Sequence, residues 1–124
     1  MYMYSNYISF LQEINSKNFN TYNFKSNKLY NLILEHVSYE QGIEYSNLIM
    51  KEFPNIMIND ILKYIEINDK YGNPKLYKIQ IHDIIVNCSP TSLRYIYHSL
   101  IIIDHYKKTG LNKIVEVGCG YGGL

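Results

Sequence analysis

The stretch that decides the fold is residues 89–110, SPTSLRYIYHSLIIIDHYKKTG, which carries the strongest helix signal in the chain. Ser89 is a favourable N-cap, and Pro90 follows at the first helical position, where its missing backbone N–H does no harm. Two lysines suit the negative end of the helix dipole, and Gly110 is a typical helix stop. The spacing gives this helix a broad apolar face, made of Leu93, Ile96, Tyr97, Leu100, Ile101 and Ile103.

Upstream of this helix, apolar spacing predicts further helices over residues 5–15, 27–37, 38–52 and 56–67. Ser5 is a candidate cap for the first of them. Ser38 and Gln41 form the S-x-x-Q pattern of a capping box at the start of the third. Gly42 lies inside that third helix, where glycine costs about 1 kcal/mol relative to alanine.

Between these helices and residues 89–110, the chain carries a turn and an extended segment. Residues 68–74, NDKYGNP, are a clear turn, since Asn, Asp and Gly tolerate tight backbone geometry and Pro restrains the adjoining backbone. Residues 76–86 partly alternate between apolar and polar side chains, which indicates a short strand. His82 and Asp83 form a polar break within it.

The last segment differs from everything before it. Residues 113–117, KIVEV, predict a buried strand, and the following GCGYGG is a glycine-rich turn. Glycines here let the backbone turn sharply and approach a ligand without a Cβ in the way. We therefore expect a mainly α chain of about five helices that leads into the first β-strand and glycine loop of a truncated α/β, Rossmann-like domain.

This strand and loop resemble the first motif of S-adenosylmethionine-dependent methyltransferases. The resemblance implies that Glu116, Gly118, Gly120 and Gly122 belong to the S-adenosyl-L-methionine site, with the acidic side chain near the methionine end of the cofactor. The same letters also satisfy the G-x-G-x-x-G fingerprint of dinucleotide-binding oxidoreductases, through Gly118, Gly120 and Gly123. The acidic residue two places before the first glycine favours the methyltransferase.

Three ordered blocks resemble the putative sugar O-methyltransferase family: residues 68–74, 89–100 and 114–124. The family has a similar N-D-x-x-G-N-P turn, an S-P-T-[ST]-L-R-Y helix start and a G-Y-G-G motif. The resemblance covers about half of the chain and implies methyl transfer to the hydroxyl of a small-molecule sugar or glycan. Arg94, the single arginine, lies in the second block and is a candidate substrate-binding residue, with a structural salt bridge as the alternative.

We divide the chain into a helical region, residues 1–110, and the start of a Rossmann-like domain, residues 111–124. An acidic residue that binds the cofactor ribose would follow about 20 residues after the glycine turn. We therefore expect an N-terminal part of a methyltransferase that is inactive by itself. A small helical interaction protein, whose glycine segment binds nothing, is the alternative of a different class.

The composition and charge balance limit the classes of partner and the cellular setting that we expect for this chain. The 12 basic and 11 acidic residues nearly cancel, so no nucleic-acid or anionic-lipid surface is indicated. No apolar run reaches the roughly 20 residues that span a membrane, and Cys88 and Cys119 do not make a disulfide framework. These features fit a cytoplasmic protein.

No catalytic base stands out. The candidates are histidines, and their spacing singles out neither a base nor a metal site: His82, His98 and His105. Ser89 and Thr91 are expected to cap the helix rather than act as nucleophiles. Cys119 is expected to be a small filler within the glycine turn.

Overall fold

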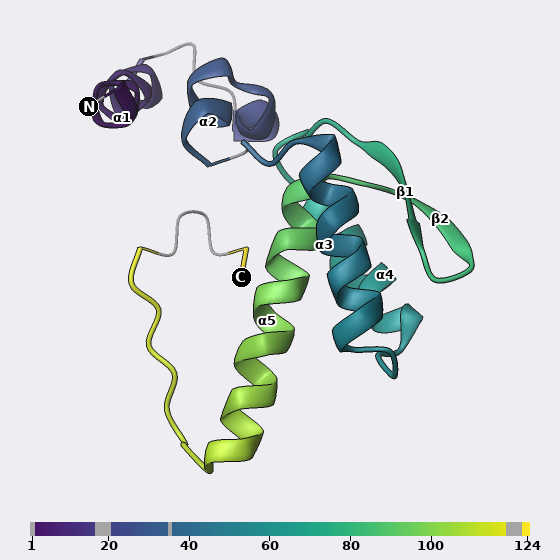
Figure 1. Ribbon diagram of the computed structural model, residues 1–124. Coiled ribbons are helices and arrows are strands. Elements are labelled where there is room, and N and C mark those ends of the chain that lie inside the picture. The colour runs from purple at the N-terminus through teal and green to yellow at the C-terminus, as the bar shows by residue number, and fades with distance from the viewer. Residues whose placement is uncertain (1, 17–20, 35, 119–122) are drawn as a thin grey trace.

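The computed structural model describes residues 2–16, 21–34, 36–118 and 123–124 of the 124-residue chain. In this part of the chain, five α-helices accompany one 3-10 helix and a two-stranded antiparallel sheet. The elements are α1 (Tyr2–Ile14), η1 (Thr21–Ser26), α2 (Lys28–Ile33), α3 (Tyr39–Glu52), α4 (Ile58–Asp69), β1 (Tyr77–Ile81), β2 (Ile84–Cys88) and α5 (Pro90–Thr109). The predicted mainly α class is confirmed (Figure 1). Across these residues, every helix is too short or too polar to cross a membrane.

Helix α5 is the element on which the others assemble, with α3 and α4 packed against it (Figure 1). Both predicted ends are confirmed: Ser89 is the N-cap, and Gly110 ends the helix in the left-handed conformation at a φ of 68°. Leu93 and Ile96 are buried, as the apolar face predicts. Ile101 and Ile103 on the same helix remain 42% and 47% exposed, so the described residues cover only its first half.

Helix α3 begins at the predicted capping box. The Gln41 amide donates to Ser38 Oγ at 3.1 Å, and the Ser38 amide donates to Gln41 Oε1 at 2.9 Å. The expected weakness at Gly42 has a packing explanation, because this residue is buried where α3 contacts the start of α5. A Cβ atom built on Gly42 would lie 2.9 Å from Cβ of Pro90.

The expected single strand is a β-hairpin. β1 and β2 pair antiparallel, with Ile79 opposite Val86 and Ile81 opposite Ile84. His82, in the predicted polar break, makes the turn with a φ of 51°. The sequence lacks the Asn-Gly or Asp-Gly pair that usually marks a two-residue hairpin, which is why the second strand was not predicted.

The core lies between this hairpin and the three longer helices that follow α2. Helix α4 contributes Ile61 and Ile65, two members of its predicted apolar stripe. The buried core consists of Ile49, Ile61, Ile65, Ile79, Ile81, Val86, Cys88, Leu93 and Ile96. Aliphatic side chains on the inward positions of both strands therefore complete the apolar faces of the helices.

The N-terminal helices differ in their bounds from the predicted ones. α1 begins at Tyr2, so Ser5 lies inside the helix and is not its cap. α2 is shorter than predicted and starts at Lys28, after the N-cap Asn27, whose side chain accepts from the amides of Leu29 and Tyr30. The apolar spacing in this region also reflects an aromatic cluster, since Tyr30 lies 5.2 Å from Phe24 and 5.5 Å from Phe10 between ring centroids.

The predicted buried strand over residues 113–117 is wrong for this chain. The segment is extended but unpaired, and it turns back after α5 (yellow in Figure 1). Val115 is 85% exposed and Val117 is 93% exposed. The physical reason is that a strand needs a neighbour for its backbone groups, and the sole sheet of the described residues is the distant hairpin.

Cys88 gives the fold a measurable pH dependence. Burial, with a smaller contribution from the charge of Asp69, raises the pKa of this thiol to about 12 from an ordinary value of 9.0. The unfolded chain therefore loses the thiol proton at a lower pH than the folded chain. Below pH 9 the thiol should not reduce the free energy of unfolding. Between pH 9 and pH 12 this free energy should fall by up to about 1.4 kcal/mol per pH unit.

Urea unfolding at a series of alkaline pH values tests this expectation. The Cys88→Ala variant should show a shallower decline of unfolding free energy above pH 9 than the wild-type chain. Other groups titrate equally in both proteins, so the difference between the two slopes isolates the thiol. Parallel slopes would contradict the assignment.

Candidate functional site

Two of the three motif blocks are joined by one carboxylate. Asp69 is the last residue of α4 and the second of the first motif block (residues 68–74), and it accepts hydrogen bonds at 2.7 Å from the Ser89 amide, the Ser89 hydroxyl and the Ser92 hydroxyl. A carboxylate at this position also faces the positive end of the α5 dipole. Asp69 therefore holds the turn against the first residues of α5.

The residue before it ties a third segment to the same place. The Asn68 side chain donates to Ser92 Oγ at 2.8 Å, and its carbonyl accepts from Lys25 Nζ at 2.7 Å. Lys25 comes from η1 and is only 1% exposed. The Asn-Asp pair of the motif thus links the N-terminal segment, the turn and the start of α5.

The glycine of the turn is required by both its backbone and its neighbours. Gly72 has a φ of 80°, a region that side chains rarely adopt. A Cβ atom here would lie 2.6 Å from Cγ of Lys25 and 2.8 Å from the Phe24 ring. The Gly72 carbonyl also accepts from the Lys25 amide at 2.8 Å. The turn is therefore the surface on which η1 docks.

The end of the third motif block, residues 123–124, lies against α4, close to the turn that contains Gly72. The Tyr64 hydroxyl on α4 donates to the carbonyl of Gly123, which is buried. A cavity of about 530 Å³ lies beside this contact, lined by Phe24, Tyr64, Ile67, Asn68, Tyr71, Gly123 and Leu124. Residues from the first and third blocks thus share one cavity wall.

The candidate cofactor residues do not form an enclosed site by themselves. Glu116 and Gly118 are exposed on the extended segment, and a Cβ atom on Gly118 would meet nothing within 4 Å. Gly118 does adopt a positive φ of 74°, which fits the sharp turn that the motif requires. Gly120 and Gly122 lie outside the described residues, as does Cys119.

Arg94 is half-buried on α5 and carries no ion pair within the described part of the chain. Its Nε is buried without a hydrogen-bond partner there, and its guanidinium carbon lies 5.3 Å from the ring centroid of Tyr95. The salt-bridge alternative finds no support in these contacts. Burial, followed by the nearby charge of Arg94, lowers the pKa of His98.

The histidines do not converge on a common centre. His82 lies in the hairpin turn, where its amide donates to Sδ of Met50 at 3.0 Å, and His98 and His105 lie on α5. In the described ranges, no group of three or more His, Cys, Asp or Glu side chains could hold a metal ion. The geometry therefore assigns no general base and no metal centre.

Sequence reasoning missed two residues near the start of α5. Ser89 caps the helix as predicted, because its hydroxyl accepts from the Ser92 amide at 3.2 Å. Thr91 is not the cap: it lies inside the helix, two residues after the N-cap Ser89, and its side chain is buried. The importance of Asp69 was also missed, because its partners lie about 20 residues away along the chain.

Comparisons with known proteins add no relative: no protein-family model, curated protein or solved structure matches this chain.

Proposed function

We propose that this chain is the N-terminal part of an S-adenosylmethionine-dependent methyltransferase that acts on a sugar hydroxyl. The observation that carries the proposal is the meeting of the three motif blocks around the C-terminal half of α4. Asp69 joins the first block to the second, and Gly123 of the third contacts Tyr64 beside the first. Blocks that merely resembled motifs by chance would have no reason to lie together.

The exposed segment after α5 supports the same proposal. Val115 and Val117 flank Glu116, and their apolar surface would be covered if residues 113–117 joined a parallel sheet. Such a sheet would come from residues beyond position 124 or from a separate polypeptide. The fold would then place the helical region beside the cofactor domain, as a wall on the substrate side.

In such a domain, Glu116 and the glycine loop would hold the methionine end of S-adenosylmethionine. The open space around Gly118 and its positive φ fit a backbone that approaches a ligand closely. The bound cofactor supplies the methyl group. Arg94 remains a candidate contact to an anionic or hydroxyl-rich substrate, since its Nε lacks a partner among the described residues. A reducing, cytoplasmic setting suits the free buried thiol of Cys88.

We expect the isolated 124-residue chain to bind S-adenosylmethionine only weakly, with no micromolar affinity in calorimetry. The reason is that Glu116 and Gly118 are exposed and the described residues form no enclosed site around them, since a Cβ atom built on Gly118 would meet nothing within 4 Å. A titration with NAD⁺ under the same conditions tests the dinucleotide alternative. Micromolar binding of S-adenosylmethionine would contradict the proposed division of the site, and tight binding of NAD⁺ would favour the oxidoreductase.

A longer reading frame, if the coding DNA continues past codon 124, allows a direct test of the site. In that protein, Glu116→Ala and Gly118→Val should each abolish cofactor binding. Glu66→Ala, an exposed change on α4, is the matched control and should leave binding unchanged. Retained affinity in both glycine-segment variants would refute the cofactor site.

A further inference from the structure

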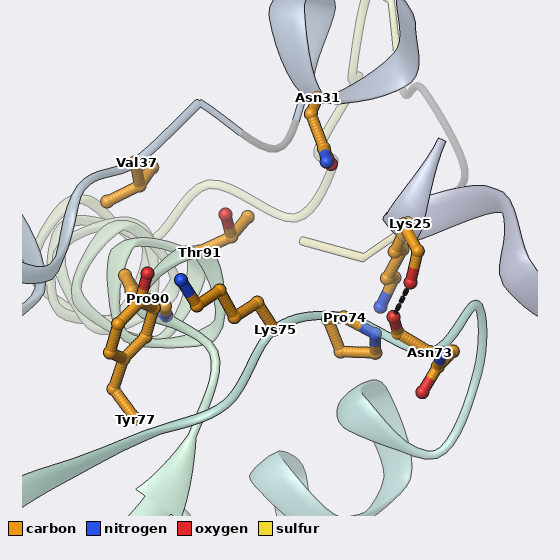
Figure 2. Close-up of a pocket in the computed structure, with 10 residues that line it drawn as sticks. Lys25, Asn31, Val37, Asn73, Pro74, Lys75, Tyr77, Pro90 and Thr91 are labelled. Atoms are coloured by element: carbon orange, nitrogen blue, oxygen red, sulfur yellow. Dashed lines mark hydrogen bonds between the residues drawn. The ribbon is translucent and has the colours of Figure 1, made fainter. Parts of the chain in front are cut away.

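The two ends of α5 differ in what surrounds them. At its start, the walls of the hollow that Thr91 lines are joined within the chain, since Ser26 donates to the Asn73 carbonyl there (Figure 2). At its other end, a hollow of about 300 Å³ lies between α5 and the segment that follows Gly110. Most of its lining is apolar and comes from Ile101, Ile102, Tyr106, Leu111 and Ile114. The second half of α5 is therefore where apolar surface of the fold stays open.

Residues 111–117 continue this open apolar surface along an extended segment. All of them are exposed, and Val115 and Val117 are the most exposed of the large apolar side chains. Within the described ranges, no backbone hydrogen bond joins the segment to another part of the fold. An extended segment whose N–H and C=O groups are free is a ready partner for another strand. Together with the apolar surface, this indicates a protein interface.

The charges of this segment are complementary to those of a second copy of the chain. Lys113 and Glu116 lie three residues apart in the sequence KIVEV. When two copies pair antiparallel with Lys113 opposite Glu116, the two-fold axis repeats the pair, so one interface holds two pairs of opposite charge. The same register puts Ile114 opposite Val115, so β-branched side chains meet at its centre. In-register parallel pairing would instead place like charges side by side, which is unfavourable.

Neighbouring antiparallel registers lack this complementarity. A shift by one residue in either direction puts Lys113 opposite a valine, Val115 or Val117, and loses both charge pairs. The register with the charge pairs also brings Val117 of one copy beside Leu111 of the other. Since Leu111 lines the hollow next to α5, an exposed valine of each copy then lies close to the hollow of the other. Charge and apolar surface therefore favour the same arrangement.

We propose that residues 111–117 pair antiparallel with the same residues of a second copy and form a symmetric dimer of the 124-residue chain. Each copy contributes the same surface: one lysine, one glutamate, the exposed valines and the hollow beside α5. An interface built on one short strand is small, so the dimer is reversible and depends on concentration. The proposal does not depend on methyl transfer. A cofactor domain that took up residues 113–117 in its own sheet would compete with the second copy for this segment.

Analytical ultracentrifugation of the 124-residue chain between about 5 and 500 µM tests this interface. The mass should rise with concentration from that of a monomer toward that of a dimer. Lys113→Glu and Glu116→Lys should each weaken the dimer about tenfold or more, because each turns two attractions into two repulsions. Lys63→Glu and Glu66→Lys make the same changes of charge at exposed positions of α4, so both should leave the dissociation constant unchanged.

Mixing the two weakened variants tests the register. A mixed dimer of Lys113→Glu with Glu116→Lys again has unlike charges at both opposite positions, so the mixture should associate about as strongly as the wild-type chain. Both variants change exposed residues, and thermal unfolding of dilute samples should show unchanged melting temperatures.

Three outcomes would overturn the proposal: a chain that stays monomeric throughout the concentration range, a dimer that neither charge reversal weakens, or a mixture that associates no better than its separate components. Each of these outcomes leaves the methyltransferase proposal standing, because the S-adenosylmethionine titration measures cofactor affinity and not self-association.

Discussion

Replacing Asp69 by alanine should lower the free energy of unfolding by about 3 kcal/mol, one of the two largest effects expected in this chain. The wild-type carboxylate accepts three hydrogen bonds of 2.7 Å, one from a backbone amide and two from the hydroxyls of Ser89 and Ser92. Alanine would leave these donors without their acceptor at the entrance to α5. It would also remove a negative charge from the positive end of that helix.

Urea denaturation measures this effect, with two companion variants as references. Asp69→Asn keeps one oxygen acceptor but brings an NH₂ group to one side of the carboxamide, so it should lose less stability than Asp69→Ala. Glu66→Ala removes an exposed carboxylate from the same helix and should change stability by less than about 0.5 kcal/mol. If Asp69→Ala were as mild as Glu66→Ala, the carboxylate would not be the link between the two motif blocks.

Replacing Gly42 by valine should cost about 3 kcal/mol, although valine is a better helix former than glycine. The position is buried where α3 crosses the start of α5. A Cβ atom would lie 2.9 Å from Cβ of Pro90, 3.1 Å from Cδ1 of Ile79 and 3.3 Å from Cα of Pro90. Since one of these atoms is backbone, the two helices would have to move apart.

A graded series tests this reasoning. Gly42→Ala should be destabilising by about 1 kcal/mol, because the clash outweighs the gain in helix propensity. Asn47→Ala, an exposed change on the same helix, should be neutral or slightly stabilising. A rise in stability for Gly42→Ala would show that α3 and α5 have room to accommodate a side chain, against the contact described here.

Local signals account for the parts of the fold that were predicted correctly. A capping box of Ser38 and Gln41 begins α3, while Ser89 caps the start of α5 and Gly110 ends it. Each of these residues acts on backbone groups close to it along the chain, so the sequence pattern identifies these helix ends. The predicted turn at residues 68–74 is equally local, because Gly72 is needed at a positive φ, although its first two residues are the last two of α4. Such devices depend little on the rest of the molecule.

The candidate site was predictable only in part. The glycine pattern identified Glu116 and Gly118, yet the strand expected before them is unpaired because its neighbours are not among the described residues. Thr91 was expected to cap α5, whereas packing leaves its hydroxyl at a cavity wall. Neither outcome has a sequence signature, because each depends on groups that are distant along the chain.

The sequence by itself determined the mainly helical class, the caps of α3 and α5 and the turn at residues 68–74, since short-range hydrogen bonds and backbone preferences control them. Only the tertiary structure decided that Asp69 would join that turn to α5, with its partners 20 to 23 residues away. The tertiary structure also decided that the buried Lys25 of η1 would donate a hydrogen bond to the Asn68 carbonyl, beside the contact between Asp69 and α5. Contacts of this kind depend on which surfaces meet when the chain folds, and the pattern of neighbouring residues does not encode that meeting.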